Sequence, residues 1–86
     1  MKLLLRLKQP FFDQILSGQK TTEYRDNSDY WRKRIIGKDI TEIEFVNGYG
    51  KSRPRMIVEC RNQCVNFSKQ YICLHLGKII SSKAAK

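Results

Sequence analysis

Three short segments alternate between apolar and polar residues with a period of two, and this pattern constrains the fold more than any other feature. The apolar positions are Leu3, Leu5 and Leu7 in the first segment, Ile43 and Phe45 in the second, and Met56, Val58 and Cys60 in the third. A period of two places such side chains on one face of a β-strand. Because 86 residues leave room for one core, the sequence predicts a single domain over residues 1–80.

The segment "PFFDQILSG", residues 10–18, has the spacing of a short helix. Proline suits the first helical turn, and Gly18 stands where a left-handed residue ends a helix. The apolar residues of one predicted face are Phe11, Phe12, Ile15 and Leu16. "DNSD" indicates a turn or a helix start, and the following "YWRKRIIG" fits either a helical turn or an extended segment.

The second half of the chain is typical of antiparallel strands. "NGYGKSRP", residues 47–54, predicts a hairpin connection longer than two residues, and "QYICLHLGKII" predicts a last strand or strand pair. "SSKAAK", residues 81–86, is expected to be a disordered basic tail. The predicted fold class is therefore α+β: a small, mostly antiparallel β-barrel with one or two short helices.

The chain is strongly basic, with 17 Lys and Arg against 8 Asp and Glu and a formal net charge of +9. This balance favours a polyanionic partner such as nucleic acid, although charge that serves only solubility is the alternative. The apolar run of "MKLLLRLKQP" is broken by Arg6 and Lys8, so it resembles neither a signal peptide nor a membrane span. We expect a cytoplasmic protein with no membrane partner and with reduced thiols.

The densest group of charges lies in "SGQKTTEYRD", residues 17–26. On a strand, Glu23 and Arg25 share a face and can pair, while Thr22 and Tyr24 would face the core. A bend after Gly18 would bring the Lys20 ammonium to the same cleft. The alternative is a surface salt bridge beside a solvated lysine.

"GQKTTEYR" matches the pattern G-x-K-x-x-E-x-R at Gly18, Lys20, Glu23 and Arg25, and so resembles the ASCH domain family of the PUA-like superfamily. "FFDQILSG", "YWRKRI" and "IEFVNGY" resemble the neighbouring segments of that family, and the similarity runs from Leu3 to about Val58. The resemblance implies a PUA-like β-barrel whose cleft carries Lys20, Glu23 and Arg25. It also implies RNA binding.

Enzymes are the second class that the resemblance suggests, because one bacterial branch removes the acetyl group of N4-acetylcytidine and other members are linked to RNA cleavage. In the deacetylating branch a threonine nucleophile occupies the position of Glu23. Thr21 is shifted by two residues and Thr22 is expected to face the core, so neither is well placed beside Lys20. If the protein is an enzyme, Lys20 and Glu23 are the candidate acid–base pair.

Two further segments combine cations with aromatic residues, as in proteins that bind single-stranded nucleic acid. The candidate ligand-binding residues there are Trp31, Arg32, Lys33 and Arg34, beside Tyr30, and Tyr49, Lys51, Arg53 and Arg55 in and after the glycine-rich connection. The alternatives are that Trp31 packs in the core and that the connection is a plain charged turn.

The remaining candidates for chemistry are Cys60, Cys64, Cys73 and His75. Their C-x3-C and C-x-H spacings differ from common zinc patterns, so we expect no metal and no cofactor, with cysteines that pack in the core. His75 is expected to be an ordinary strand residue.

These observations predict an RNA- or nucleotide-binding domain. An enzyme acting on RNA or a modified nucleoside, and a protein-interaction module for an acidic partner, are the alternatives. We expect Lys20→Ala and Glu23→Ala to preserve the fold and to weaken ligand binding.

Overall fold

The structure is a computed structural model that describes residues 1–48, 53–66 and 68–83. It is an α+β fold with two helices, as predicted. In chain order the elements are β1 (Lys2–Leu7), α1 (Gln9–Leu16), β2 (Thr22–Asp26), α2 (Asp29–Ile35), β3 (Glu42–Asn47), β4 (Arg55–Asn66) and β5 (Tyr71–Lys83).

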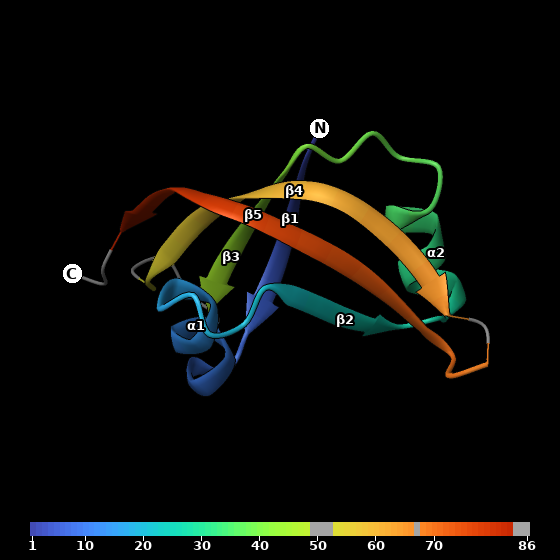
Figure 1. The fold of residues 1–86 in the computed structure, drawn as a ribbon, viewed down its shortest axis with the longest axis horizontal. Coiled ribbons are helices and arrows are strands. Elements are labelled where there is room, and N and C mark those ends of the chain that lie inside the picture. The colour runs from blue at the N-terminus through green and yellow to red at the C-terminus, as the bar shows by residue number, and fades with distance from the viewer. Residues whose placement is uncertain (49–52, 67, 84–86) are drawn as a thin grey trace.

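All five strands form one sheet in the order β1-β3-β4-β5-β2. The β1–β3 pair is parallel and the other three pairs are antiparallel, which confirms a mostly antiparallel sheet. The sheet curls into a half-barrel in which β4 and β5 arch across the molecule, with α1 near one end and α2 near the other (Figure 1). Because β1 and β2 are the two edge strands, an open seam separates them.

The alternating segments bury the faces that the sequence predicted. The buried set on β1, β3 and β4 comprises Leu3, Leu5, Leu7, Ile43, Phe45, Met56, Val58 and Cys60. Residues of α1, α2 and β5 complete one hydrophobic cluster: Phe12, Ile15, Ile35, Ile72, Leu74 and Leu76. Since burial of apolar surface is the main favourable term in folding, this single cluster holds the elements together.

Helix α1 ends as expected, but its buried face is narrower than predicted. Gly18 has φ +85° and follows the last turn, where the Ser17 N–H donates to the Asp13 carbonyl at 2.9 Å. Phe12 and Ile15 are buried, whereas Phe11 and Leu16 are 45% and 42% exposed. A helix of eight residues buries only one narrow stripe here, so the predicted four-residue face is wrong.

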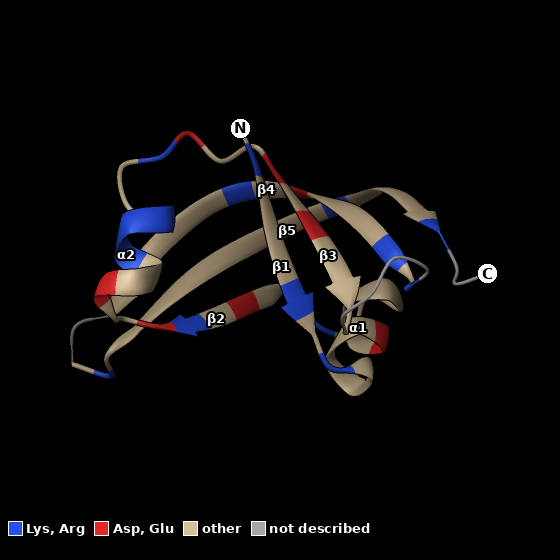
Figure 2. Cartoon of the chain, turned by 180° about the vertical axis from the view of Figure 1, so that it is seen from behind, with Lys and Arg blue, Asp and Glu red and all other residues tan. Residues whose placement is uncertain are grey.

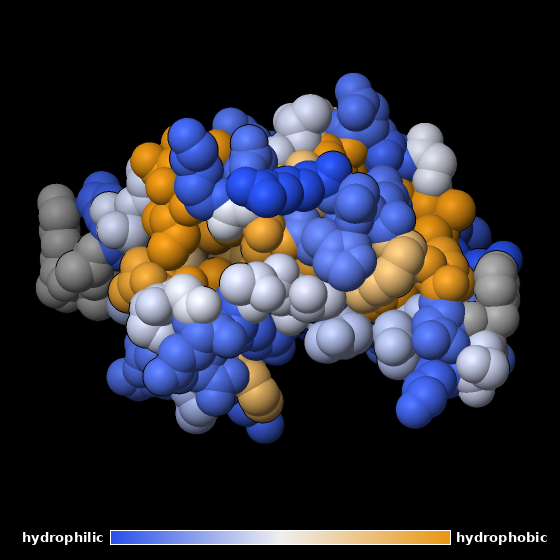
Figure 3. Space-filling view, in the orientation of Figure 1, coloured by the Kyte–Doolittle hydropathy of each residue, from blue (hydrophilic) through white to orange (hydrophobic). Residues whose placement is uncertain are grey.

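An apolar groove separates α1 from β5, and its lining includes Leu16, Leu76 and Ile79. Figure 3 shows hydrophobic side chains gathered at this end of the molecule. Of the helices that the structure describes, none has the length and apolar character needed to cross a bilayer.

Helix α2 settles the ambiguity of "YWRKRIIG" in favour of a helix. The Ser28 hydroxyl accepts a hydrogen bond from the Trp31 N–H at 3.4 Å and so caps the first turn. Ile35 is buried in the core, and Trp31 packs against it from a half-buried position. The preference for Trp31 as a packing residue is thus confirmed.

Strand β4 bends through register shifts between residues 57 and 62, which is how β-bulges let long strands curve. Its partner β5 is one continuous strand that extends to Lys83. Ser81, Ser82 and Lys83 pair with Ile57, Met56 and Arg55, so the prediction of a disordered tail from residue 81 is wrong for these three residues. Residues 84–86 lie outside the described part of the chain.

Candidate functional site

Strand β2 presents a carboxylate where the other four strands present apolar side chains. Glu23 is 3% exposed and Tyr24 is 53% exposed. The prediction that Thr22 and Tyr24 face the core is therefore wrong, and the Glu23 and Arg25 face points inward. The reason is electrostatic: a buried carboxylate is stable when cations and hydrogen bonds compensate it, and both are present here.

Glu23 lies between two cations, and we call Lys20, Glu23 and Arg25 the Glu23 triad. The Lys20 Nζ lies 2.8 Å from Oε1 of Glu23, and an Arg25 terminal nitrogen donates to Oε2 at 2.7 Å. The Lys20 backbone N–H donates to the Gln14 carbonyl at 3.0 Å, which fixes the turn between α1 and β2. The predicted bend after Gly18 and the predicted Glu23–Arg25 pair are both confirmed.

The triad is a buried charge network rather than a surface salt bridge. Side-chain exposure is 4% for Glu23, 22% for Lys20 and 19% for Arg25. Both Glu23 oxygens already bind cations, so Glu23 positions Lys20 and Arg25 and has little surface left for a ligand. Removing one member of a buried network leaves charge uncompensated. The expectation that Glu23→Ala preserves the fold therefore changes to one of marked destabilisation.

Arg25 also joins the two edges of the sheet. Its terminal nitrogen donates to the Arg6 carbonyl at 3.3 Å, which brings β2 against β1 across the open seam. The Arg6 side chain donates to the Gly48 carbonyl at 3.0 Å, beyond the end of β3. Arg25 and Arg6 are thus held by two backbone carbonyls, one on β1 and one just after β3.

The first cleft opens at this seam, beside the end of β1 and the start of α1. It has a volume of about 610 Å³. It is lined by Arg6, Leu7, Lys8, Phe11, Lys20, Glu23, Tyr24, Arg25 and Gly48. The Lys20 ammonium lies 5.0 Å from the centre of the Phe11 ring, so this cleft combines cations with an exposed aromatic face.

The second cleft lies along the same seam, on the side of α2, and has a volume of about 760 Å³. Its lining comprises Met1, Leu3, Leu4, Arg6, Arg25, Tyr30, Trp31, Lys33, Arg34 and Lys38. The Arg25 guanidinium lies 5.1 Å from the Trp31 ring centre, and that of Arg34 lies 3.6 Å from the centre of Tyr30. Arg6 and Arg25 belong to both clefts, which therefore adjoin.

Positive charge dominates the two clefts. Together their linings contain seven cations, Arg6, Lys8, Lys20, Arg25, Lys33, Arg34 and Lys38, and one carboxylate, that of the buried Glu23. Figure 2 shows basic positions on β1, β2 and α2, the elements that border the seam. Such a surface attracts anions and repels cationic ligands, including metal ions.

The structure gathers only some of the predicted site residues. Lys20, Glu23, Arg25, Trp31, Lys33 and Arg34 line one or both clefts. Arg32 and Arg53 are exposed but lie outside both linings. Arg55 lies elsewhere, on β4, where it pairs with Glu44 at 3.2 Å and is not part of either cleft. Tyr49 and Lys51 fall outside the described residues.

The lining residues that were not predicted include the cations Arg6, Lys8 and Lys38 and the aromatic residue Phe11. Arg6 was visible as the cation that interrupts the leucines of the first strand, and Phe11 as the first of two adjacent phenylalanines. The approach of β1 to β2 could not be predicted from the sequence, because these strands are not paired and lie at opposite edges of the sheet.

The first cleft offers little for nucleophilic catalysis. The described residues of its lining include no Ser, Thr, Cys or His. Thr21 is exposed outside this lining, and Thr22 is on the opposite face of β2 from Glu23. Since a hydroxyl nucleophile must lie within hydrogen-bond reach of its base, the geometry favours binding over acyl transfer.

Cys60 is a buried free thiol, as predicted, but Cys64 and Cys73 differ from the prediction of reduced, core-packed thiols. Cys64 and Cys73 form a disulfide across β4 and β5. Cys73 and Cys60 are buried, whereas Cys64 and His75 are exposed. Burial raises the pKa of the Cys60 thiol, which therefore stays protonated near neutral pH.

Three comparisons of this chain with known proteins found no relative. No family model matches the chain, and neither the curated proteins nor the solved structures contain a match.

Proposed function

We propose that this chain is an RNA- or nucleotide-binding domain that holds its ligand in the two adjoining clefts of the β1–β2 seam. The observation that carries the proposal is the seven cations of these clefts against one buried, already paired carboxylate. Phosphate contacts supply most of the affinity of proteins for nucleic acid. The same proposal places the protein in the cytoplasm.

Single-stranded RNA fits the clefts better than a duplex. Tyr30 is 55% exposed beside the second cleft, and Phe11 is 45% exposed beside the first. Unpaired bases stack on aromatic rings, whereas the bases of a duplex are covered by their neighbours. A strand that crosses the seam would meet an aromatic face on each side of Arg6 and Arg25.

Membership of the ASCH family is part of the proposal. Its support is the G-x-K-x-x-E-x-R pattern together with the position of that pattern, which begins at the end of α1 and continues into β2. The three charged residues of the pattern form the Glu23 triad. A PUA-like fold is the arrangement that this family membership implies.

Binding is favoured over catalysis because Glu23 is buried and both of its oxygens bind cations. A carboxylate in that state holds the cations in place rather than reaching a substrate proton. The Lys20 ammonium, by contrast, directs one of its three N–H donors at Glu23, and the others can bind a phosphate oxygen.

The test is binding of a fluorescent single-stranded RNA octamer, measured by anisotropy at several salt concentrations. We expect Lys33→Ala/Lys38→Ala to weaken binding and to reduce the slope of log K against log [salt] by about 0.7 per lost phosphate contact. Lys78→Ala/Lys83→Ala, which removes two exposed lysines outside both clefts, is the charge-matched control. Equal affinities for the double variant and the control would overturn the proposal.

A competition arm separates RNA from an acidic protein, because both would bind in a salt-dependent way. Unlabelled single-stranded RNA should displace the probe at far lower nucleotide concentration than poly-glutamate does at equal charge. Equal competition by the two polyanions would favour the protein-interaction alternative.

A further inference from the structure

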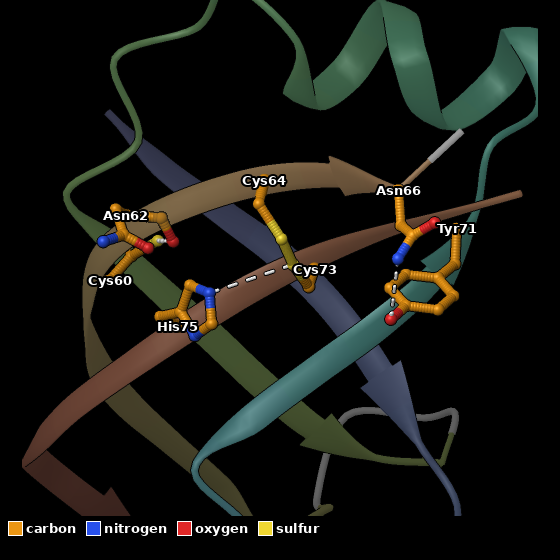
Figure 4. Close-up of a disulfide and its surroundings, with 7 residues drawn as sticks. All are labelled: Cys60, Asn62, Cys64, Asn66, Tyr71, Cys73 and His75. Atoms are coloured by element: carbon orange, nitrogen blue, oxygen red, sulfur yellow. Dashed lines mark hydrogen bonds between the residues drawn. A yellow bond between two sulfur atoms is a disulfide. The ribbon is translucent and has the colours of Figure 1, made fainter. Parts of the chain in front are cut away.

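Three side chains with metal-binding atoms lie on one face of the β4–β5 pair, away from both clefts. Cys64 and Cys73 are directly opposite each other in the antiparallel register, with their Cα atoms 5.1 Å apart. His75 follows Cys73 by two residues, so its side chain lies on the same face of β5. Figure 4 shows the imidazole turned toward the two sulfur atoms.

The three candidate ligand atoms lie close enough together to reach one ion once the sulfurs are no longer bonded to each other. The two sulfur atoms and a ring nitrogen of His75 all lie within 4.8 Å of one another, and Nε2 of His75 lies 3.9 Å from the Cys73 sulfur. In a tetrahedral zinc site, bonds of about 2.3 Å to sulfur and about 2.0 Å to nitrogen place the ligand atoms about 3.5–3.8 Å apart. With the S–S bond broken, side-chain rotations on the fixed backbones of β4 and β5 can therefore bring the three atoms to these separations.

The oxidation state of the sulfurs decides whether such a site exists. In the disulfide, the sulfurs are bonded to each other and no thiolate is available. Reduction by a cellular thiol such as glutathione transfers two electrons and two protons, breaks the S–S bond and leaves two thiols, while the reductant becomes a disulfide. Binding of a metal ion then releases the thiol protons, because thiolate is the ligand.

The exposure and chemistry of these side chains determine how an ion reaches the group and which ion it prefers. Cys64 and His75 are exposed, so an ion can reach them from solvent. Cys60 does not join the group, because the register shift between Cys60 and Asn62 leaves it in the core. Two thiolates and an imidazole suit zinc, whereas calcium and magnesium prefer oxygen ligands.

We propose that the reduced protein binds a zinc ion through Cys64, Cys73 and His75, with water in the fourth position, and that the disulfide and the metal are alternative states of one site. The reducing cytoplasm favours the dithiol, and an oxidant would expel the ion by forming the disulfide.

The experiment titrates Co²⁺, a spectroscopic substitute for Zn²⁺, into protein reduced with a phosphine under nitrogen. We expect a thiolate-to-cobalt charge-transfer band that saturates at one ion per chain and is abolished by one equivalent of Zn²⁺. The disulfide form should give no such band. Equal binding by both forms, no band with the reduced protein, or saturation at one ion per two chains would overturn the proposal.

Variants assign the ligands. Cys64→Ser and His75→Ala change exposed residues, so they should leave the circular dichroism spectrum unchanged while weakening Co²⁺ binding at least about tenfold. Cys60→Ser is the control and should retain the band. Loss of the band in the control with retention in His75→Ala would assign the site to other residues and refute the proposal.

Discussion

Among the described residues, two charge triads have identical composition, each with one glutamate between a lysine and an arginine. In the Glu23 triad the carboxylate lies 2.8 Å from Lys20 and 2.7 Å from Arg25. In the second, which we call the Glu44 triad, Glu44 lies 3.5 Å from Lys2 and 3.2 Å from Arg55. Lys2 and Arg55 are 48% and 37% exposed, about twice the exposure of Lys20 and Arg25.

The comparison shows that position in the fold, and not residue type, separates a site from a surface salt bridge. Glu44 faces outward from β3, between two paired strands, and water solvates its partners. Glu23 faces inward at the unpaired edge of β2, where two clefts meet. Each prediction below therefore has a counterpart in the Glu44 triad.

The largest expected effect is that of Glu23→Ala on stability. Removing the carboxylate leaves Lys20 and Arg25 without their shared partner in a poorly solvated position, which we expect to cost about 3 kcal/mol of unfolding free energy. Glu44→Ala should cost at most about 1 kcal/mol, because its partners are solvated. Urea unfolding followed by circular dichroism measures both values, and similar losses would show that burial does not distinguish the triads.

Arg25→Lys tests the geometry of the seam. Lysine keeps the charge but lacks the planar fork that contacts Glu23, the Arg6 carbonyl and the Trp31 ring together. We expect about 1.5–3 kcal/mol of lost stability, since hydrogen bonds to charged groups contribute about that much each. Arg55→Lys is the counterpart and should leave the free energy of unfolding nearly unchanged. A change in Trp31 fluorescence in Arg25→Lys, but not in Arg55→Lys, would support a contact specific to the seam.

The smallest expected effect is that of Lys2→Ala. An exposed pair at 3.5 Å contributes about 0–1 kcal/mol, and Lys2 lies outside both cleft linings. Thermal unfolding should shift by no more than the error of replicate scans, and RNA affinity should be unchanged. A clear loss of RNA affinity would mean that the basic surface binds without regard to the clefts.

The sequence predicted those parts of the fold that local periodicity determines. The buried faces of Leu3–Leu7 and Ile43–Phe45 and the left-handed Gly18 after the end of α1 depend on neighbours in the chain, and all were correct. The inward face of β2 was assigned incorrectly because the choice between Glu23 and Tyr24 depends on the ion pairs of Glu23 with Lys20 and Arg25 and on the tertiary position of the strand.

The candidate site was predictable to the same limited extent. Lys20, Glu23 and Arg25 lie within six residues, so one motif was enough to group them. Arg6 and Lys38 contribute through contacts between elements that are distant in the chain, and no periodicity encodes these contacts. The Cys64–Cys73 pair likewise depends on the register of β4 against β5, which bulges shift along the strand.

The most direct test of the central claim compares Lys20→Ala with Lys2→Ala in binding of single-stranded RNA at low and moderate salt. Both variants remove one lysine from a lysine–glutamate–arginine triad, so the net charge changes equally. We predict that Lys20→Ala weakens binding about tenfold, or about 1.4 kcal/mol, and lowers the salt slope, while Lys2→Ala matches the unmodified protein. Equal affinities and slopes for the two variants would contradict the assignment of RNA binding to the β1–β2 seam.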